Sequence, residues 1–342
     1  MIARGNHYGF YFAAKKQRWH FALRQKPVET HLNCLVYRTR GCSSRRRGFT
    51  KTKIREENKL SRRWPKRLCL VLAALITFIA LRACSELMRE PGMTAAQTQL
   101  VQVDITDLCE QVEAGEELSP QQRQTLMEQT GLGEPGLEAV LEDQNAEYLL
   151  ECQQAWFAVP ETECIDNGLT SSEELLVDAR QPRFYDLQTG DILVSLNSHT
   201  VGYRHGHAAL VVDGEMGTTL EAATMGTDSM LLGVSHWRDY PSVVQLRLKG
   251  DSYDAQALGE QAAEAALEYL QGIPYDLFCG FLLPSLPVEP PDTVQCASLV
   301  WYAYALIGVD LHLNGLMASP TTLLNSPELE VVQAFGGSYL EG

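Results

Sequence analysis

The pattern of hydrophobic and polar residues divides the chain into stretches with different predicted structures. Residues 1–67 show neither helical nor strand periodicity, so we expect a disordered tail there. An uncharged apolar run then extends from Leu68 to Leu81. Hydrophobic residues at helical spacing occupy 94–166, and strand-like runs begin near Arg183. The sequence therefore predicts a small helical module followed by a mixed domain over 183–342.

The helical module has recognisable helix boundaries. Ser119 is expected as an N-cap with Pro120 at the first helical position, and the sequence GLG ends that helix before another begins. The many Glu and Gln residues of the module are typical of a solvated surface around a thin core of Leu and Ala. We therefore assign no chemistry to it.

The pattern beyond Arg183 predicts a strand meander followed by two helices. A polar stretch with few strand signals, 167–183, leads to GDILV, in which a Gly-Asp turn opens an apolar strand. One helix is predicted over 254–272, and a second begins near Thr293 after a Pro-rich loop. The strands of the meander are expected over 206–212, 218–224, 231–237 and 242–248. The predicted fold class is α+β.

Charge is distributed very unevenly along the chain. Residues 1–67 hold 19 of the 28 Lys and Arg residues but only 3 of the 43 Asp and Glu residues. The remainder carries an excess of 31 negative charges. An acidic body is a poor match for polyanions, so we expect no nucleic-acid partner.

The boundary between the basic tail and the acidic body predicts a signal or membrane anchor over 68–84. A basic cluster precedes the apolar run, whose 14 residues would form a helix of about 21 Å. That length falls short of the ~30 Å hydrocarbon core but suits a signal peptide or a tilted anchor, and a buried core helix is the alternative. Because Lys and Arg remain cytoplasmic, residues 86–342 should be extracytoplasmic, as on a bacterial surface. The sequence LRACS also resembles a lipoprotein cleavage site before Cys84.

The nine cysteines show neither a CxxC pair nor the regular spacing of a zinc site or disulfide scaffold. Cys152 and Cys164 flank a short segment, so they are candidates for a disulfide bond if the body lies outside the cell. Cys296 differs because the expected N-cap, Asp292 or Thr293, places it in the first helical turn. Unpaired N–H groups and the helix dipole favour a thiolate there. The alternative is a buried cysteine that packs as a small hydrophobe.

A nucleophilic cysteine needs a base and a group that orients the base, and the meander supplies candidates for both. His207 opens an apolar strand, and Glu221 lies in the next one. A hairpin centred on Gly214 would place the two directly opposite each other, with Cβ atoms about 4.5–5.5 Å apart. His205 is a competing base, but its place in a loop favours His207. A zinc site at His205 and His207 is an alternative that no other ligand cluster supports, so we predict no metal.

Five segments in this order, GDILV, HGHAALVVDG, LEAA, GIPYDLF and QCASLVWYAY, resemble the permuted papain-like amidases of the YiiX type. These are distant relatives of NlpC-type cell-wall hydrolases. The similarity covers roughly residues 186–330, and the strand with His precedes the helix with Cys, as in the permuted form. It implies a circularly permuted papain-like domain with an antiparallel sheet packed on helices. It also implies Cys296 as the nucleophile, His207 as the base and Glu221 as the orienting group.

Further residues are expected around this cleft. The resemblance places Asp191 and Tyr275 near it. Gln295, just before the cysteine, is a secondary candidate for donating a hydrogen bond to an oxyanion. The loop between Tyr275 and Cys296 is long and Pro-rich, which departs from the family pattern and leaves the substrate class open.

Three functions are compatible with the sequence. The first is a thiol-dependent amidase or peptidase that cleaves cell-wall peptides by acyl transfer. The second uses the same site on lipid acyl esters, as the related lecithin:retinol acyltransferases do, at a membrane reached through 68–84. The third is a surface binding module without catalysis. The complete Cys-His-Glu set favours an enzyme, and we expect no cofactor, because no P-loop pattern occurs in the sequence.

Overall fold

The structure is a computed structural model that describes residues 67–80, 101–167, 171–200, 203–250, 253–313 and 317–337. Most of the predicted tail, the cleavage site at Cys84 and the start of the helical module lie outside these residues. A helix covers 67–80, where the anchor is expected, and its side chains are exposed. Among the described helices, none combines the length and the apolar character needed to cross a membrane.

The helical module forms four short helices. Ser119 caps the second of them as predicted, because its side chain accepts the backbone N–H of Gln122 and Pro120 is the first helical residue. This helix ends at Gly131, whose positive φ of 71° is the left-handed conformation that glycine adopts without strain. The helices are α2 (Thr106–Glu113), α3 (Pro120–Thr130), α4 (Glu134–Glu142) and α5 (Ala146–Phe157).

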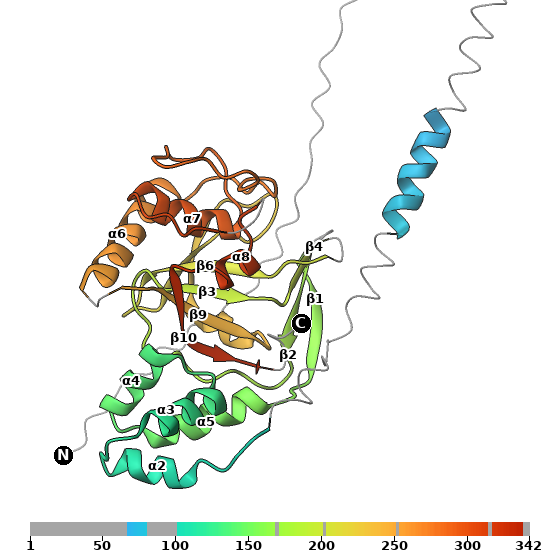
Figure 1. The fold of residues 1–342 in the computed structure, drawn as a ribbon. Coiled ribbons are helices and arrows are strands. Elements are labelled where there is room, and N and C mark those ends of the chain that lie inside the picture. Colours follow the sequence, from blue (N-terminus) through green and yellow to red (C-terminus); the bar gives the residue numbers. More distant parts are fainter. Residues whose placement is uncertain are drawn as a thin grey trace, which may run out of the picture. The chain divides into compact units, whose positions relative to one another are not determined.

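The strands form two antiparallel sheets, so the predicted α+β class is confirmed (Figure 1). The larger sheet has the order β10-β9-β3-β6-β7-β8, and the smaller has the order β1-β2-β4-β5. The larger sheet contains β3 (Ile192–Ser195), β6 (His207–Asp213), β7 (Thr218–Glu221), β8 (Met230–Gly233), β9 (Val243–Leu248) and β10 (Leu329–Phe335). The smaller sheet contains β1 (Thr162–Asp166), β2 (Ser171–Leu176), β4 (Ser198–Thr200) and β5 (Tyr203–Arg204).

Several predicted boundaries are wrong. The stretch 167–183 contains β2, whose sequence SSEELL lacks the β-branched and aromatic residues that mark a strand, and pairing with β1 and β4 holds it extended. The strand predicted over 231–237 ends at Gly233, and a 3₁₀ helix, η2 (Val234–Asp239), follows. Strand β10 lies beyond the two predicted helices and pairs with β9.

The larger sheet lies between two layers of helices (Figure 1). One face packs on α6 (Tyr253–Tyr269) and α7 (Cys296–Leu306), through inward residues such as Leu210. The other face packs on the helical module, through residues such as Val211, which follows Leu210 and therefore points the opposite way. The short helix α8 (Pro320–Leu324) contacts β3 and α7.

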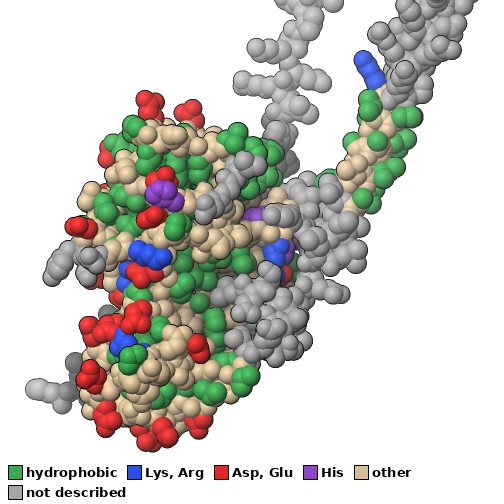
Figure 2. Space-filling view, viewed as in Figure 1, with side chains coloured by type: hydrophobic (Ala, Val, Ile, Leu, Met, Phe, Trp, Pro, Cys, Tyr) green, Lys and Arg blue, Asp and Glu red, His purple; other side chains and the backbone are tan. Residues whose placement is uncertain are grey.

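The helical module and the mixed domain therefore share a hydrophobic core rather than forming two separate bodies. Residues 65–342 group into one compact unit, and the expected boundary near Arg183 runs through it. Acidic side chains gather on the exposed side of the helical module, in agreement with the predicted solvated surface (Figure 2). Cys152 of α5 and Cys164 of β1 are both free thiols, so the disulfide considered for them is not formed.

Candidate active site

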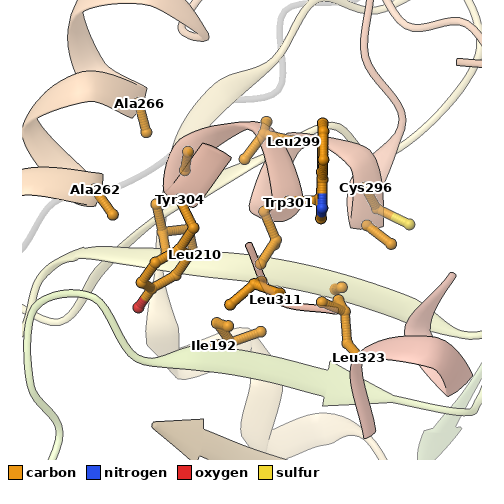
Figure 3. Close-up of a cluster of buried hydrophobic side chains, with 14 of the residues drawn as sticks. Ile192, Leu210, Ala262, Ala266, Cys296, Leu299, Trp301, Tyr304, Leu311 and Leu323 are labelled. Carbon is orange, nitrogen blue, oxygen red and sulfur yellow. The ribbon is translucent and has the colours of Figure 1, made fainter. Parts of the chain in front are cut away.

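Cys296 is the first residue of α7 (Figure 3). The N-cap is Gln295, not Asp292 or Thr293, because the preceding segment is extended: Val294 forms a parallel bridge with Tyr275 and donates its N–H to the Pro274 carbonyl. The cysteine is only 4 % exposed, and its sulfur points away from the hydrophobic cluster under α7. The predicted position of Cys296 in the first helical turn is confirmed.

The side chain of Gln295 caps the N-terminus of α7. Its Oε1 accepts the backbone N–H of Ala297 at 2.9 Å and the Cys296 thiol at 3.3 Å, and its Nε2 donates to the Ala318 carbonyl at 2.6 Å. The side chain does not line the cleft described below. The backbone N–H of Cys296 itself, one of the N–H groups without an intrahelical acceptor, is the better candidate donor to an oxyanion.

His207 and Glu221 are hydrogen-bonded, with 2.7 Å between Nε2 and Oε2. The predicted register is wrong by two residues: Leu210 pairs with Leu220, which carries Glu221 to the position opposite Ala209. The hairpin turns further along the chain than expected, since Asp213 pairs with Thr218, and after the bulge between Val211 and Asp213 the two side chains meet diagonally on one face of the sheet. Because Nε2 is bound to Glu221, Nδ1 is the ring nitrogen left for the thiol.

Three more donors surround the Glu221 carboxylate, which is 1 % exposed. Its Oε1 accepts the Thr219 hydroxyl at 2.6 Å and the indole N–H of Trp237 at 2.9 Å, and His236 Nε2 lies 3.3 Å from it. The Trp237 ring also stacks on His207, with centroids 5.3 Å apart and planes 10° from parallel. Sequence reasoning missed His236 and Trp237, since a strand over 231–237 would point them to opposite faces.

The charges of the pair follow from these contacts. Burial opposes the charged form of His207, but hydrogen bonds and charge interactions with Cys296 and Glu221 outweigh it and raise the pKa of the imidazole. Burial likewise opposes ionisation of Glu221, but the His207 and His236 donors hold its pKa well below its usual range. At neutral pH the pair is therefore an imidazolium and a carboxylate.

Cys296 and His207 line a cleft of about 330 Å³. The cleft extends between the start of β6 and the smaller sheet, so Ser172 of β2 and Ser198 of β4 form part of its wall. Tyr275 also lines it, and the nearby Cys296 contributes to raising the pKa of its phenol, after the larger effect of burial. The expected place of Tyr275 beside the cleft is confirmed.

His205 lines the same cleft but is not bonded to Glu221. Its Nε2 lies 2.7 Å from the Thr200 hydroxyl. Burial lowers the pKa of His205 to about 4, so the imidazole is neutral at pH 7. His207 has both the carboxylate and the thiol as partners, so it is the candidate base.

Asp191 does not lie at the cleft, contrary to expectation. It precedes β3, whereas His207 pairs with Ser195 at the other end of that strand. Its carboxylate accepts two hydrogen bonds from Arg247, at 2.8 and 2.9 Å, and a third from Gln245, so it forms a buried structural ion pair. Within the described ranges, no three His, Cys, Asp or Glu side chains are arranged to hold a metal ion.

Comparison of the chain with protein-family models, with curated protein sequences and with solved structures gave no match.

Proposed function

We propose that the protein is a thiol-dependent hydrolase that cleaves an amide bond by acyl transfer at Cys296, within a permuted papain-like domain. The observation that carries this proposal is the buried His207–Glu221 hydrogen bond of 2.7 Å in the cleft that Cys296 also lines. A nucleophilic cysteine, a base and a group that orients the base are the three parts that such chemistry needs. The resemblance to cell-wall amidases favours a peptide substrate on the outer surface of a bacterium, reached from a membrane-anchored or exported chain.

In the first half of the reaction, the Cys296 thiolate attacks the carbonyl carbon, and the negative charge moves to the carbonyl oxygen. The backbone N–H of Cys296, at the positive end of α7, stabilises this oxyanion. His207 then donates its proton to the leaving nitrogen, the C–N bond breaks, and an amine departs. A thioester on Cys296 remains.

In the second half, the now neutral His207 removes a proton from water while the water oxygen attacks the thioester carbonyl. The C–S bond breaks, a carboxylic acid is released, and the thiolate and imidazolium return. Glu221 accepts the His207 Nε2–H throughout and so keeps Nδ1 directed toward the reaction. Tyr275, at the cleft wall, is placed to contact the substrate.

A direct test uses p-nitrophenyl acetate as the acyl donor with the full chain. We expect an acetyl group on Cys296, located by peptide mass spectrometry, and a burst of p-nitrophenol equal to the enzyme concentration. His207→Ala should slow acetylation by about 100-fold or more, because the base is lost. Cys279, a partly buried thiol at the loop beside α7, serves as the internal control and should remain unmodified. Equal acetylation of both cysteines would refute the proposal.

A lipid ester is the second candidate substrate, and an exposed apolar loop favours it. Phe278, Phe281 and Leu282 follow Tyr275 closely in the chain, and Phe278 is 75 % exposed. Large exposed apolar groups beside a site are typical of surfaces that contact lipid or apolar partners. In the same assay, a strong preference for p-nitrophenyl palmitate over the acetate, lost in Phe278→Ser, would identify this function. Equal rates on the palmitate and acetate esters would favour the amidase.

A further inference from the structure

Residue His236 of η2 is not required by the mechanism above, yet it lies against the orienting carboxylate. Its Nδ1 is 2.8 Å from the Gly233 carbonyl, and its Nε2 is 3.3 Å from Glu221 Oε1. Both neighbours are acceptors that cannot donate a proton. Only an imidazolium, with a proton on each ring nitrogen, satisfies both contacts.

The charge balance of the site gives this imidazolium a role. While Cys296 is a thiolate and His207 an imidazolium, those two charges compensate each other and leave Glu221, which is 1 % exposed, as an extra buried anion. A buried carboxylate without a countercharge is costly, and it would hold the proton on His207 strongly. His207, however, must be neutral before it can accept a proton from water. A carboxylate with no second cation would therefore oppose the hydrolysis of the thioester.

We propose that His236 is a positioning residue that shares the Glu221 carboxylate with His207, balances its charge, and so allows His207 to become neutral when the thioester is hydrolysed. This inference rests on the proposed function. His236 neither touches the thiol nor lines the cleft, so it acts through Glu221. Trp237 donates a hydrogen bond to the same oxygen, Glu221 Oε1, and stacks on His207, so it fixes the positions of both side chains. His236 balances the charge of the carboxylate.

Two titratable groups act on His236, and they come from two neighbouring strands. Glu221 of β7 attracts a proton to it, and His207 of β6 opposes this. Tyr240, which follows η2, is a buried phenol whose pKa is raised by burial and further by Glu173 of β2 and by Glu221. Burial works against protonation of His236, but Glu221 outweighs it and raises the pKa of the imidazole. The positive charge of His236, which balances Glu221, should therefore be present at neutral pH and be lost as the pH rises.

The experiment is an NMR titration of the histidines in the full chain with Cys296→Ala, so that no thiolate contributes. In His236→Gln, which keeps an amide donor but no charge, we expect the titration midpoint of His207 to rise by about one pH unit. The matched control is His312→Gln, which removes a largely exposed imidazole 3.0 Å from Glu328 and should leave the midpoint of His207 unchanged. An unchanged midpoint in His236→Gln would overturn the inference.

A kinetic measurement separates this inference from the proposed function. With Cys296 present, His236→Gln should keep the p-nitrophenol burst but slow the steady-state rate by about tenfold at pH 6, because less His207 is neutral. A burst and steady state both equal to those of the original chain would overturn the catalytic role of His236. If the titration midpoint of His207 shifts in His236→Gln but the original chain gives no p-nitrophenol burst, the proposed function is refuted instead.

Discussion

At the scale of single residues, Glu221 determines whether the candidate site can work. A carboxylate buried without partners would take up a proton, because isolated charges in a protein interior are very costly. Thr219, Trp237 and two histidines give Glu221 four donors instead, and it stays ionised. The charged form of His207 is stabilised in turn, which keeps a proton beside Cys296, as the proposed mechanism requires.

The neutral His205 predicts an acid-sensitive stability. In the unfolded chain its pKa is near 6.5, but in the folded chain burial lowers it to about 4. The unfolded state therefore binds the proton first, and folding stability falls as the pH drops from about 6.5 to 4, by up to roughly 3 kcal/mol. We expect His205→Gln to flatten this part of a curve of unfolding free energy against pH, measured by urea denaturation. If the unfolding free energy of His205→Gln falls as steeply over this pH range as that of the original chain, the account is contradicted.

The residues of the site differ in how well a sequence can identify them. Cys296, His207 and Glu221 are recognisable because each belongs to a local pattern, a helix start or an apolar strand, and because they occur in a family order. Trp237 and His236 are not, since their role depends on η2, a 3₁₀ helix where the hydrophobic pattern predicts a strand. A tryptophan beside a histidine in the sequence does not by itself indicate that either contacts a buried carboxylate.

At the scale of elements, the start of β6 positions His207, the candidate base. Gly206 precedes His207 with a positive φ of 79°, and a Cβ at this position would lie 2.3 Å from the Ser195 carbonyl oxygen. Glycine is required here both for the left-handed backbone and for the close approach to β3. The histidine at the next position takes its direction from this tight connection.

Gly206→Ala should therefore displace His207 as well as destabilise the fold. The control is Gly226→Ala, because Gly226 has a similar φ of 87° but no atom within 4 Å of an added Cβ. Both variants should lose about 1 kcal/mol through backbone strain, and Gly206→Ala should lose more and should also slow acetylation of Cys296. Thermal unfolding and the acetylation assay measure the two effects. Equal losses in the two variants would show that the contact with β3 is unimportant.

Some strands can be predicted from the sequence and others cannot. The apolar strands β3, β6 and β9 are recognisable in the sequence because both of their faces are buried by helices. Strand β2 is not, because its residues are mostly Ser and Glu rather than the β-branched and aromatic residues that mark a strand. The smaller sheet, which forms one wall of the cleft, is therefore the part of the site that the sequence conceals.

At the scale of the whole molecule, the fold joins a helix and a strand that are distant in the chain. Cys296 belongs to the layer of α6 and α7, whereas His207 and Glu221 belong to the sheet that this layer covers. The helical module packs on the opposite face and shares its core with β6 through Ala209 and Val211. The α+β class is predictable from local patterns, but this layering depends on contacts between distant residues, which no local pattern encodes.

The central claim is that this architecture activates Cys296 through His207. The most direct measurement is the rate of alkylation of Cys296 by iodoacetamide in the full chain, followed by mass spectrometry between about pH 5 and 9, because only the thiolate reacts. The account predicts that Cys296 reacts faster than Cys279 below pH 7 and that His207→Ala removes this advantage. A Cys296 that reacts no faster than Cys279, or whose rate does not depend on His207, would contradict it.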